Sequence, residues 1–64
     1  MAKYDIDVQL TGQNGNVYNL MSLVIIALRE HGVSKDEQEQ FKDECRSGDY
    51  DNALRTMARW VNVQ

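Results

Sequence analysis

The sequence has one cysteine, Cys45, and no proline among its 64 residues. A single cysteine excludes a disulfide within the chain, and a lone thiol is typical of a reducing compartment. The first residues lack an apolar run behind a basic start, so a secretory signal is not expected. Together, these two features predict a cytoplasmic location. Because no repeat, linker or low-complexity segment divides the chain, we also predict one small domain over residues 1–64.

Concentrated positive charge is also missing. Seven Lys and Arg residues against ten Asp and Glu residues give a formal net charge of −3. Recognition of DNA or RNA relies on clustered basic residues that neutralise phosphates, so nucleic acid is not an expected partner. The only basic pair without intervening acids is Arg55 and Arg59, near the end of the chain.

The longest apolar run, "VYNLMSLVIIAL" at residues 17–28, is too short for a membrane span, which needs about 20 residues. As a helix it has an apolar arc much wider than the stripe of roughly 100° that suffices on the surface of a monomer. We therefore expect it to lie between the strand and the third helix. Because so short a chain buries a small core, we also predict a homo-oligomer in which a second subunit covers part of this helix or a strand edge.

Residues 3–11 alternate between apolar and polar side chains, which predicts a strand with one buried face. Its apolar members are Tyr4, Ile6, Val8 and Leu10. The turn "TGQNGN" follows, and Asn16 is placed to cap a helix from Val17 that ends at Gly32. The sequence "SKDE" reads as a capping box, which begins a second helix over residues 35–46.

Asp49 is placed to cap a third helix with an apolar stripe that includes Tyr50 and Trp60. This helix is expected to cover the first, whereas the second helix, with only Phe41 and Cys45 as a strong apolar pair, offers little. Residues 61–64, "VNVQ", alternate again and indicate a short second strand. The predicted fold is α+β, a small β-α-α-α(-β) domain with one or two short strands packed on a three-helix layer.

Arg55 and Arg59 lie one turn apart beside Asn52 and Thr56, on the expected polar face of the third helix, where two guanidinium groups can grip a phosphate or carboxylate. Gly15 and Asn16 stand at a helix N-terminus, a common place for anions. We name five candidate binding residues: Gly15, Asn16, Asn52, Arg55 and Arg59. The alternatives are a solvated face with an Asp51–Arg55 pair, and a simple turn with a cap.

The chain offers little for catalysis or metal binding. His31 and Cys45 are too few for a zinc site, and no base is tied to Cys45 by sequence. Asp5 and Asp7 share the polar face of the strand without a third ligand, and a solvated face explains them. We therefore expect no metal, no cofactor and no enzymatic activity.

Three stretches, "VQLTGQNGN", "ALREHGVSKDE" and "SGDYDNALRTMARWVNV", cover much of the chain. Together they resemble small uncharacterised proteins encoded by bacteriophages and prophages, which share an LTG-x-x-GN turn and an SGDYD…RWV ending. The resemblance implies an accessory protein that acts inside a bacterial host cell. It carries over no catalytic residue.

These observations favour a non-enzymatic phage accessory protein, a homo-oligomer that engages a host protein in host takeover or defence antagonism. The alternative is an oligomer that sequesters a small anionic ligand such as a nucleotide signal, bound by Arg55 and Arg59. A mimic of nucleic acid built on the acids of the second helix is a third hypothesis, for which a net charge of −3 is weak support.

Overall fold

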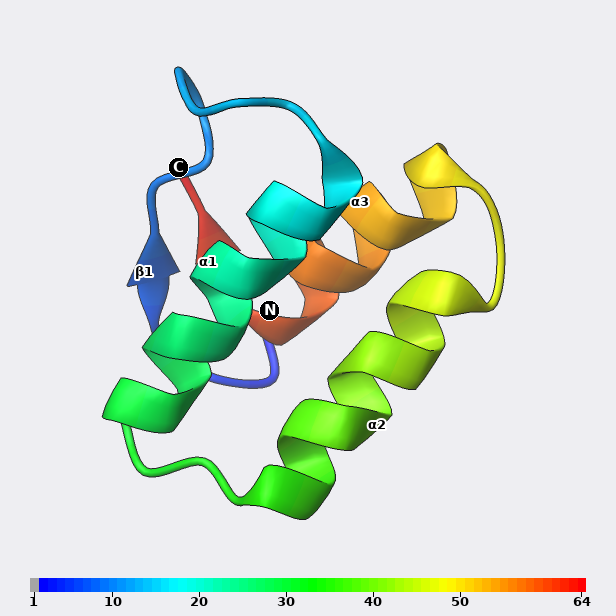
Figure 1. Ribbon diagram of the computed structural model, residues 1–64. Coiled ribbons are helices and arrows are strands. Elements are labelled where there is room, and N and C mark those ends of the chain that lie inside the picture. Colours follow the sequence, from blue (N-terminus) through cyan, green and yellow to red (C-terminus); the bar gives the residue numbers. More distant parts are fainter. Residues whose placement is uncertain (1) are drawn as a thin grey trace.

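The computed structural model describes residues 2–64, and it has two short strands and three helices in these residues (Figure 1). The elements are β1 (Asp7–Val8), α1 (Val17–Glu30), α2 (Lys35–Arg46), α3 (Tyr50–Trp60) and β2 (Asn62–Val63). The strands are parallel, with Asp7 opposite Asn62 and Val8 opposite Val63. The sheet lies at one side of the molecule and the helices form the rest. This confirms the α+β prediction and the short second strand.

The first strand is shorter than the predicted range of residues 3–11. Its ladder covers two residues because the partner segment at the C-terminus is equally short. The flanking backbone is still tied to that end of the chain, since Lys3 N–H donates to the Arg59 carbonyl at 2.7 Å and Leu10 N–H donates to the Gln64 carbonyl at 2.7 Å. The predicted alternation therefore holds beyond the ladder, and Ile6, Val8 and Leu10 are buried.

Both ends of α1 follow the predicted capping chemistry. The Asn16 side chain accepts a hydrogen bond from the Tyr18 N–H at 2.9 Å. At the other end Gly32 has a φ of 79°, and Val33 N–H donates to the Leu28 carbonyl at 3.0 Å. This is the Schellman arrangement, in which a left-handed glycine ends the helix and satisfies its last carbonyls.

The starts of α2 and α3 are capped by Ser34 and Asp49, which accept from Glu37 N–H at 3.2 Å and from Asn52 N–H at 2.9 Å. The reciprocal half of the predicted capping box is not formed. Instead, the Glu37 carboxylate accepts hydrogen bonds from the Tyr4 hydroxyl at 2.6 Å and from the Lys3 ammonium at 2.8 Å. Glu37 thus binds the N-terminal segment to α2.

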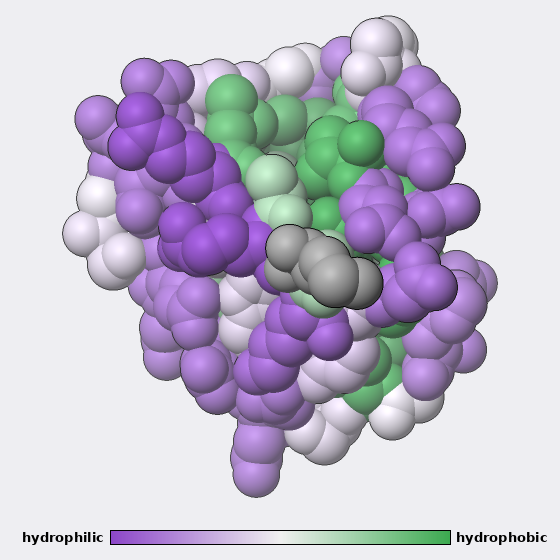
Figure 2. Space-filling view, turned by 180° about the vertical axis from the view of Figure 1, so that it is seen from behind, coloured by the Kyte–Doolittle hydropathy of each residue, from purple (hydrophilic) through white to green (hydrophobic). Residues whose placement is uncertain are grey.

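Helix α1 packs against α2, α3 and β1. The expectation that α2 would contribute little to the core is wrong, because Phe41 and Cys45 are both buried between the helices. None of the helices in residues 2–64 combines the length and the apolar character required to cross a bilayer. On the rear face, the apolar side chains in view gather mainly in the upper half, between hydrophilic ones, and a smaller group lies at the lower right (Figure 2).

Two residues of α3 differ from their predicted environment. Tyr50, expected in the buried stripe, is 47% exposed, whereas Thr56, expected on the polar face, is fully buried. The Thr56 hydroxyl donates to the Asn52 carbonyl at 2.8 Å and accepts from the Arg59 guanidinium at 3.0 Å, so its burial leaves no polar atom unpaired.

Trp60 is buried where α2, α3 and the N-terminal segment meet. Its ring packs edge-on against Phe41, with centroids 5.5 Å apart, and lies 5.9 Å from the ring of Tyr4. The indole N–H donates to the Glu44 carboxylate at 2.9 Å, and the Lys3 ammonium lies 4.3 Å from the ring centroid. The side chain therefore combines aromatic packing, a charge-assisted hydrogen bond and a cation–π contact.

Replacing Trp60 with alanine is expected to lower the free energy of unfolding by about 3–5 kcal/mol, because a large buried aromatic side chain is lost from a small core. Trp60→Phe keeps a ring but removes the bond to Glu44, and should cost less. Urea titration followed by circular dichroism measures both. An unchanged midpoint for Trp60→Ala would contradict the central role of this residue.

The same cluster makes stability depend on pH. Hydrogen bonds from Lys3 and Tyr4 lower the pKa of Glu37, and the bond from Trp60 lowers the pKa of Glu44. The Glu37 carboxylate in turn raises the pKa of Lys3 and of Tyr4. A lowered pKa in the folded state favours folding above the ordinary pKa of the group, and a raised pKa favours folding below it.

We therefore expect the free energy of unfolding to be highest over a middle range of pH and to fall at both the acidic and the alkaline end. The contribution of the two glutamates is present above about pH 4.5 and is lost as the pH falls through their lowered pKa values. The contribution of Tyr4 and Lys3 is complete below about pH 10 and is lost as the pH rises further. Urea midpoints measured across this range give the profile, and Glu37→Gln should reduce the fall at both ends. A profile that is the same in Glu37→Gln would refute the assignment.

Candidate functional site

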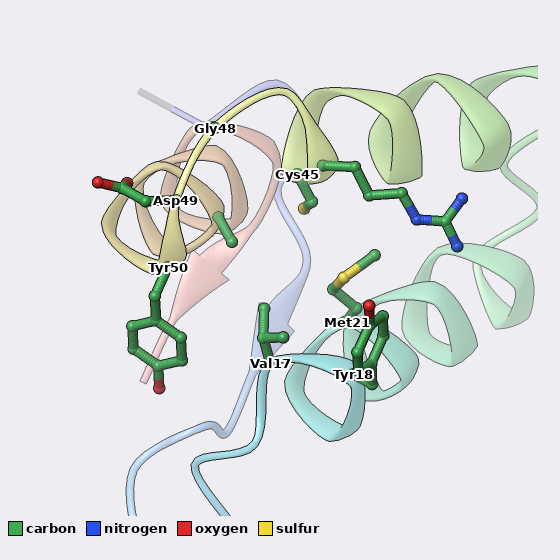
Figure 3. Close-up of a pocket in the computed structure, with 9 residues that line it drawn as sticks. Val17, Tyr18, Met21, Cys45, Gly48, Asp49 and Tyr50 are labelled. Atoms are coloured by element: carbon green, nitrogen blue, oxygen red, sulfur yellow. The ribbon is translucent and has the colours of Figure 1, made fainter.

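A groove of about 330 Å³ opens between the start of α1 and the turn that joins α2 to α3 (Figure 3). Its floor is apolar and comes from three helices, with Val17 and Met21 from α1, Cys45 from α2 and Ala53 from α3. Met21, Cys45 and Ala53 belong to the buried core, so the groove reaches down to it. Its volume lies at the lower end of the range of ligand pockets.

Two exposed tyrosines flank the groove, one from the first turn of α1 and one from the first residue of α3. Tyr18 is 65% exposed and Tyr50 is 47% exposed. The Tyr50 hydroxyl donates to the Gly15 carbonyl at 2.7 Å, which holds its ring and joins the loop before α1 to α3. Exposed aromatic rings with a polar tip are suited to contact a partner whose surface is part apolar and part wet.

Arg46, the last residue of α2, gives the groove a positive charge. Its exposed side chain lines the groove together with Tyr18 and Met21. The ion pairs within residues 2–64 join Lys3 to Glu37 and Lys42 to Glu39, so neither uses Arg46. Asp49 also lines the groove, but its carboxylate points away from the centre and caps α3.

The Cys45 thiol is part of the apolar floor. Burial raises its pKa to about 11, so the thiol is protonated at neutral pH. Because the thiolate is the reactive form, this cysteine is a poor nucleophile. The expectation that Cys45 is a small buried hydrophobic residue is confirmed.

The five predicted anion-binding residues do not form one site. Gly15 and Asn16 lie on the side of α3 where Tyr50 reaches them. Arg59 follows Tyr50 by nine residues. At about 100° per residue this leaves the two side chains about 180° apart around the helix axis, so Arg59 lies on the opposite side of α3. The carbonyl of Gly15 accepts from Tyr50, and Asn16 is occupied as the cap of α1.

The remaining three candidates share one side of α3, but two of them are already engaged. The Asn52 amide donates to the Glu44 carbonyl at 2.9 Å, and the Arg59 guanidinium donates to Thr56 at 3.0 Å. Arg55 is exposed, and the anticipated pair with Asp51 is not among the ion pairs of residues 2–64. Anion binding by these arginines stays a prediction, with Arg55 as its least committed side chain.

No group of three or more potential metal ligands occurs within residues 2–64. Asp5 and Asp7 do lie close together, since both carboxylates accept from the Asn62 amide, at 2.7 and 3.0 Å. His31 lies at the C-terminal end of α1, before α2 begins, whereas Cys45 lies in the last turn of α2, so the two do not share a site.

The groove brings together two stretches on which the resemblance to phage proteins rests, because Tyr50 of "SGDYD" bonds to Gly15 of "TGQNGN". Sequence reasoning missed its three prominent side chains. The patterns place Tyr50 in the apolar stripe of the third helix and Tyr18 in the apolar run of residues 17–28, and no pattern singles out Arg46. The available signal was their position, since residues in the first or last turn of a helix have fewer neighbours within the helix. Comparison with protein-family models, curated proteins and solved structures finds no match for the chain.

Proposed function

We propose that the chain is a small non-enzymatic binding protein that holds a segment of a partner protein in the groove between Tyr18 and Tyr50. The observation that carries this proposal is the combination of an apolar floor, two exposed tyrosines and an arginine outside any ion pair of the described residues. Tyrosine and arginine are enriched among the residues that dominate binding energy at protein interfaces. Tyrosine also offers a large contact area with few rotatable bonds.

The ionisable groups of the groove favour binding over catalysis. Its thiol is protonated at neutral pH, and its carboxylate, that of Asp49, is engaged in capping α3. An acid–base reaction needs a donor and an acceptor in hydrogen-bond reach of each other or of the substrate. The other side chains that line the groove are apolar, phenolic or guanidinium groups.

With the phage resemblance, this geometry supports an accessory protein that binds a host protein inside the bacterial cell, in host takeover or defence antagonism. The alternative, sequestration of a small anionic ligand by Arg55, Arg59, Asn52, Gly15 and Asn16, has less support. Asn52 and Arg59 are engaged within the fold, and Gly15 and Asn16 lie across α3 from Arg59.

Panning a random peptide-display library against the protein tests the proposal. Selected peptides, measured by calorimetry, should lose about 5- to 30-fold in affinity with Tyr18→Ala or Tyr50→Ala, which is the usual effect of removing an aromatic hot spot. Arg29→Ala is the control, because Arg29 lies about three turns along α1 from Tyr18, is exposed and does not line the groove. Peptides that bind both tyrosine variants as tightly as the unaltered protein would place the binding site elsewhere.

We also propose self-association. Ile26 on α1 is 41% exposed and Val63 on β2 is 42% exposed. Within residues 2–64 the sheet has only two strands, so the outer edge of each has no strand beside it. Two-stranded sheets are marginal on their own, and a second copy that covers such surface would stabilise this one.

Light scattering should accordingly give a mass above that of one 7.4 kDa chain. Either Ile26→Glu or Val63→Glu should lower that mass while the helical circular dichroism is kept, because a buried unpaired charge opposes association. A single-chain mass for the unaltered protein at micromolar concentrations would count against self-association.

A further inference from the structure

The charge distribution around the groove specifies what the bound segment should carry. The chain is acidic overall, with a net charge of −3, yet the cation Arg46 lines the groove. Asp49 is turned away and caps α3, and Glu44, two residues before Arg46, is bonded to the Trp60 indole and to Gln40. The guanidinium of Arg46 therefore has unused donors beside an apolar floor.

A carboxylate matches this arrangement in charge and in geometry. The planar guanidinium donates two parallel hydrogen bonds to a carboxylate, and such charge-assisted bonds are about twice as strong as neutral ones. Tyr18 also lines the groove and is largely exposed, so its hydroxyl is a further donor for a bound carboxylate.

A phosphate matches less well, because it brings a larger negative charge and commonly relies on free N–H groups at a helix N-terminus. The two helices that start at the groove are already capped by Asn16 and Asp49. The carboxylate of Asp49 would also repel a phosphate placed at the start of α3.

The apolar floor sets the second requirement. Val17, Met21 and Ala53 offer no hydrogen-bonding side-chain groups, and the Cys45 thiol is a weak donor. A polar side chain placed there would lose water without a partner, whereas a large aliphatic or aromatic side chain would gain contact area.

Resting on the proposed function, we infer that the groove binds an acidic peptide segment in which a large apolar side chain enters between the two tyrosines and a neighbouring carboxylate pairs with Arg46. The carboxylate is that of an Asp or Glu side chain within the segment. A terminal carboxylate in its place is an outcome that the experiment separates.

The test uses a synthetic peptide array in which each member has one Leu, Phe or Trp next to Glu, Gln or Lys. A second set places the apolar residue at a free or an amidated C-terminus. Fluorescence polarisation with the full chain measures the dissociation constants. Peptides with Glu should bind about tenfold or more tighter than those with Gln, because a charge-assisted bond is lost in the latter. A preference for the free over the amidated terminus, with none for Glu over Gln, would overturn the assignment to a side-chain carboxylate.

Substitutions at Arg46 make the assignment specific. Arg46→Gln should abolish the difference between Glu and Gln peptides, and Arg46→Glu should reverse the preference toward Lys peptides. Arg29→Gln is the matched control, since Arg29 is also exposed and its replacement removes the same charge, but Arg29 does not line the groove. Arg55→Gln tests the alternative anion site on α3. Circular dichroism melting of each variant shows whether it is folded.

The outcomes distinguish this inference from the proposed function. Binding that requires Tyr18 but is equal for Glu and Gln peptides, or insensitive to Arg46→Gln, overturns the acidic-peptide inference and leaves the groove as a docking site. Loss of the Glu preference in Arg55→Gln instead of Arg46→Gln also overturns it. Binding of no peptide in the array overturns both proposals.

Discussion

The fold depends on the contacts of the Trp60 indole at the end of α3. This one side chain touches the N-terminal segment through Tyr4 and the Lys3 ammonium, and it touches α2 through Phe41 and Glu44. The main chain after it turns directly into β2, so the position of the indole also sets where β2 meets β1. The N-terminal segment is also tied to the C-terminal residues by backbone hydrogen bonds, from Lys3 N–H to the Arg59 carbonyl and from Leu10 N–H to the Gln64 carbonyl. The indole joins these paired segments to α2.

Local chemistry explains why the helices could be predicted closely from the sequence. Asn16, Ser34 and Asp49 cap the three helices as expected, and Gly32 ends the first. The length of β1 could not be predicted, because alternation reveals which face is buried but not how many residues the partner offers. The role of Glu37 was also missed, since a capping box is a local pattern and the competing donors come from residues 33 or more positions away.

The candidate site could not be predicted from the sequence for a similar reason, because it depends on residues that are far apart in the chain. A helical wheel assigns Tyr18 and Tyr50 to apolar faces, but it treats a helix as though its whole length were covered. Both tyrosines lie in the first turn, where the neighbouring elements end. The bond from Tyr50 to Gly15 joins residues 35 positions apart, and Arg46 reaches the groove only because α2 ends beside the start of α1. These are properties of the tertiary arrangement.

The groove also accounts for the wide apolar arc of α1. Along most of its length the helix is covered by α2, α3 and β1, and its buried side chains extend from Leu20 to Leu28. Val17 and Tyr18 of its first turn line the groove together with Met21. Apolar surface beside a capped, and therefore satisfied, helix end is better suited to an apolar side chain than to an ion. Arg46, whose charge is outside any ion pair of the described residues, then makes that surface selective. It favours partners in which an acidic group lies next to the apolar side chain that the groove contacts.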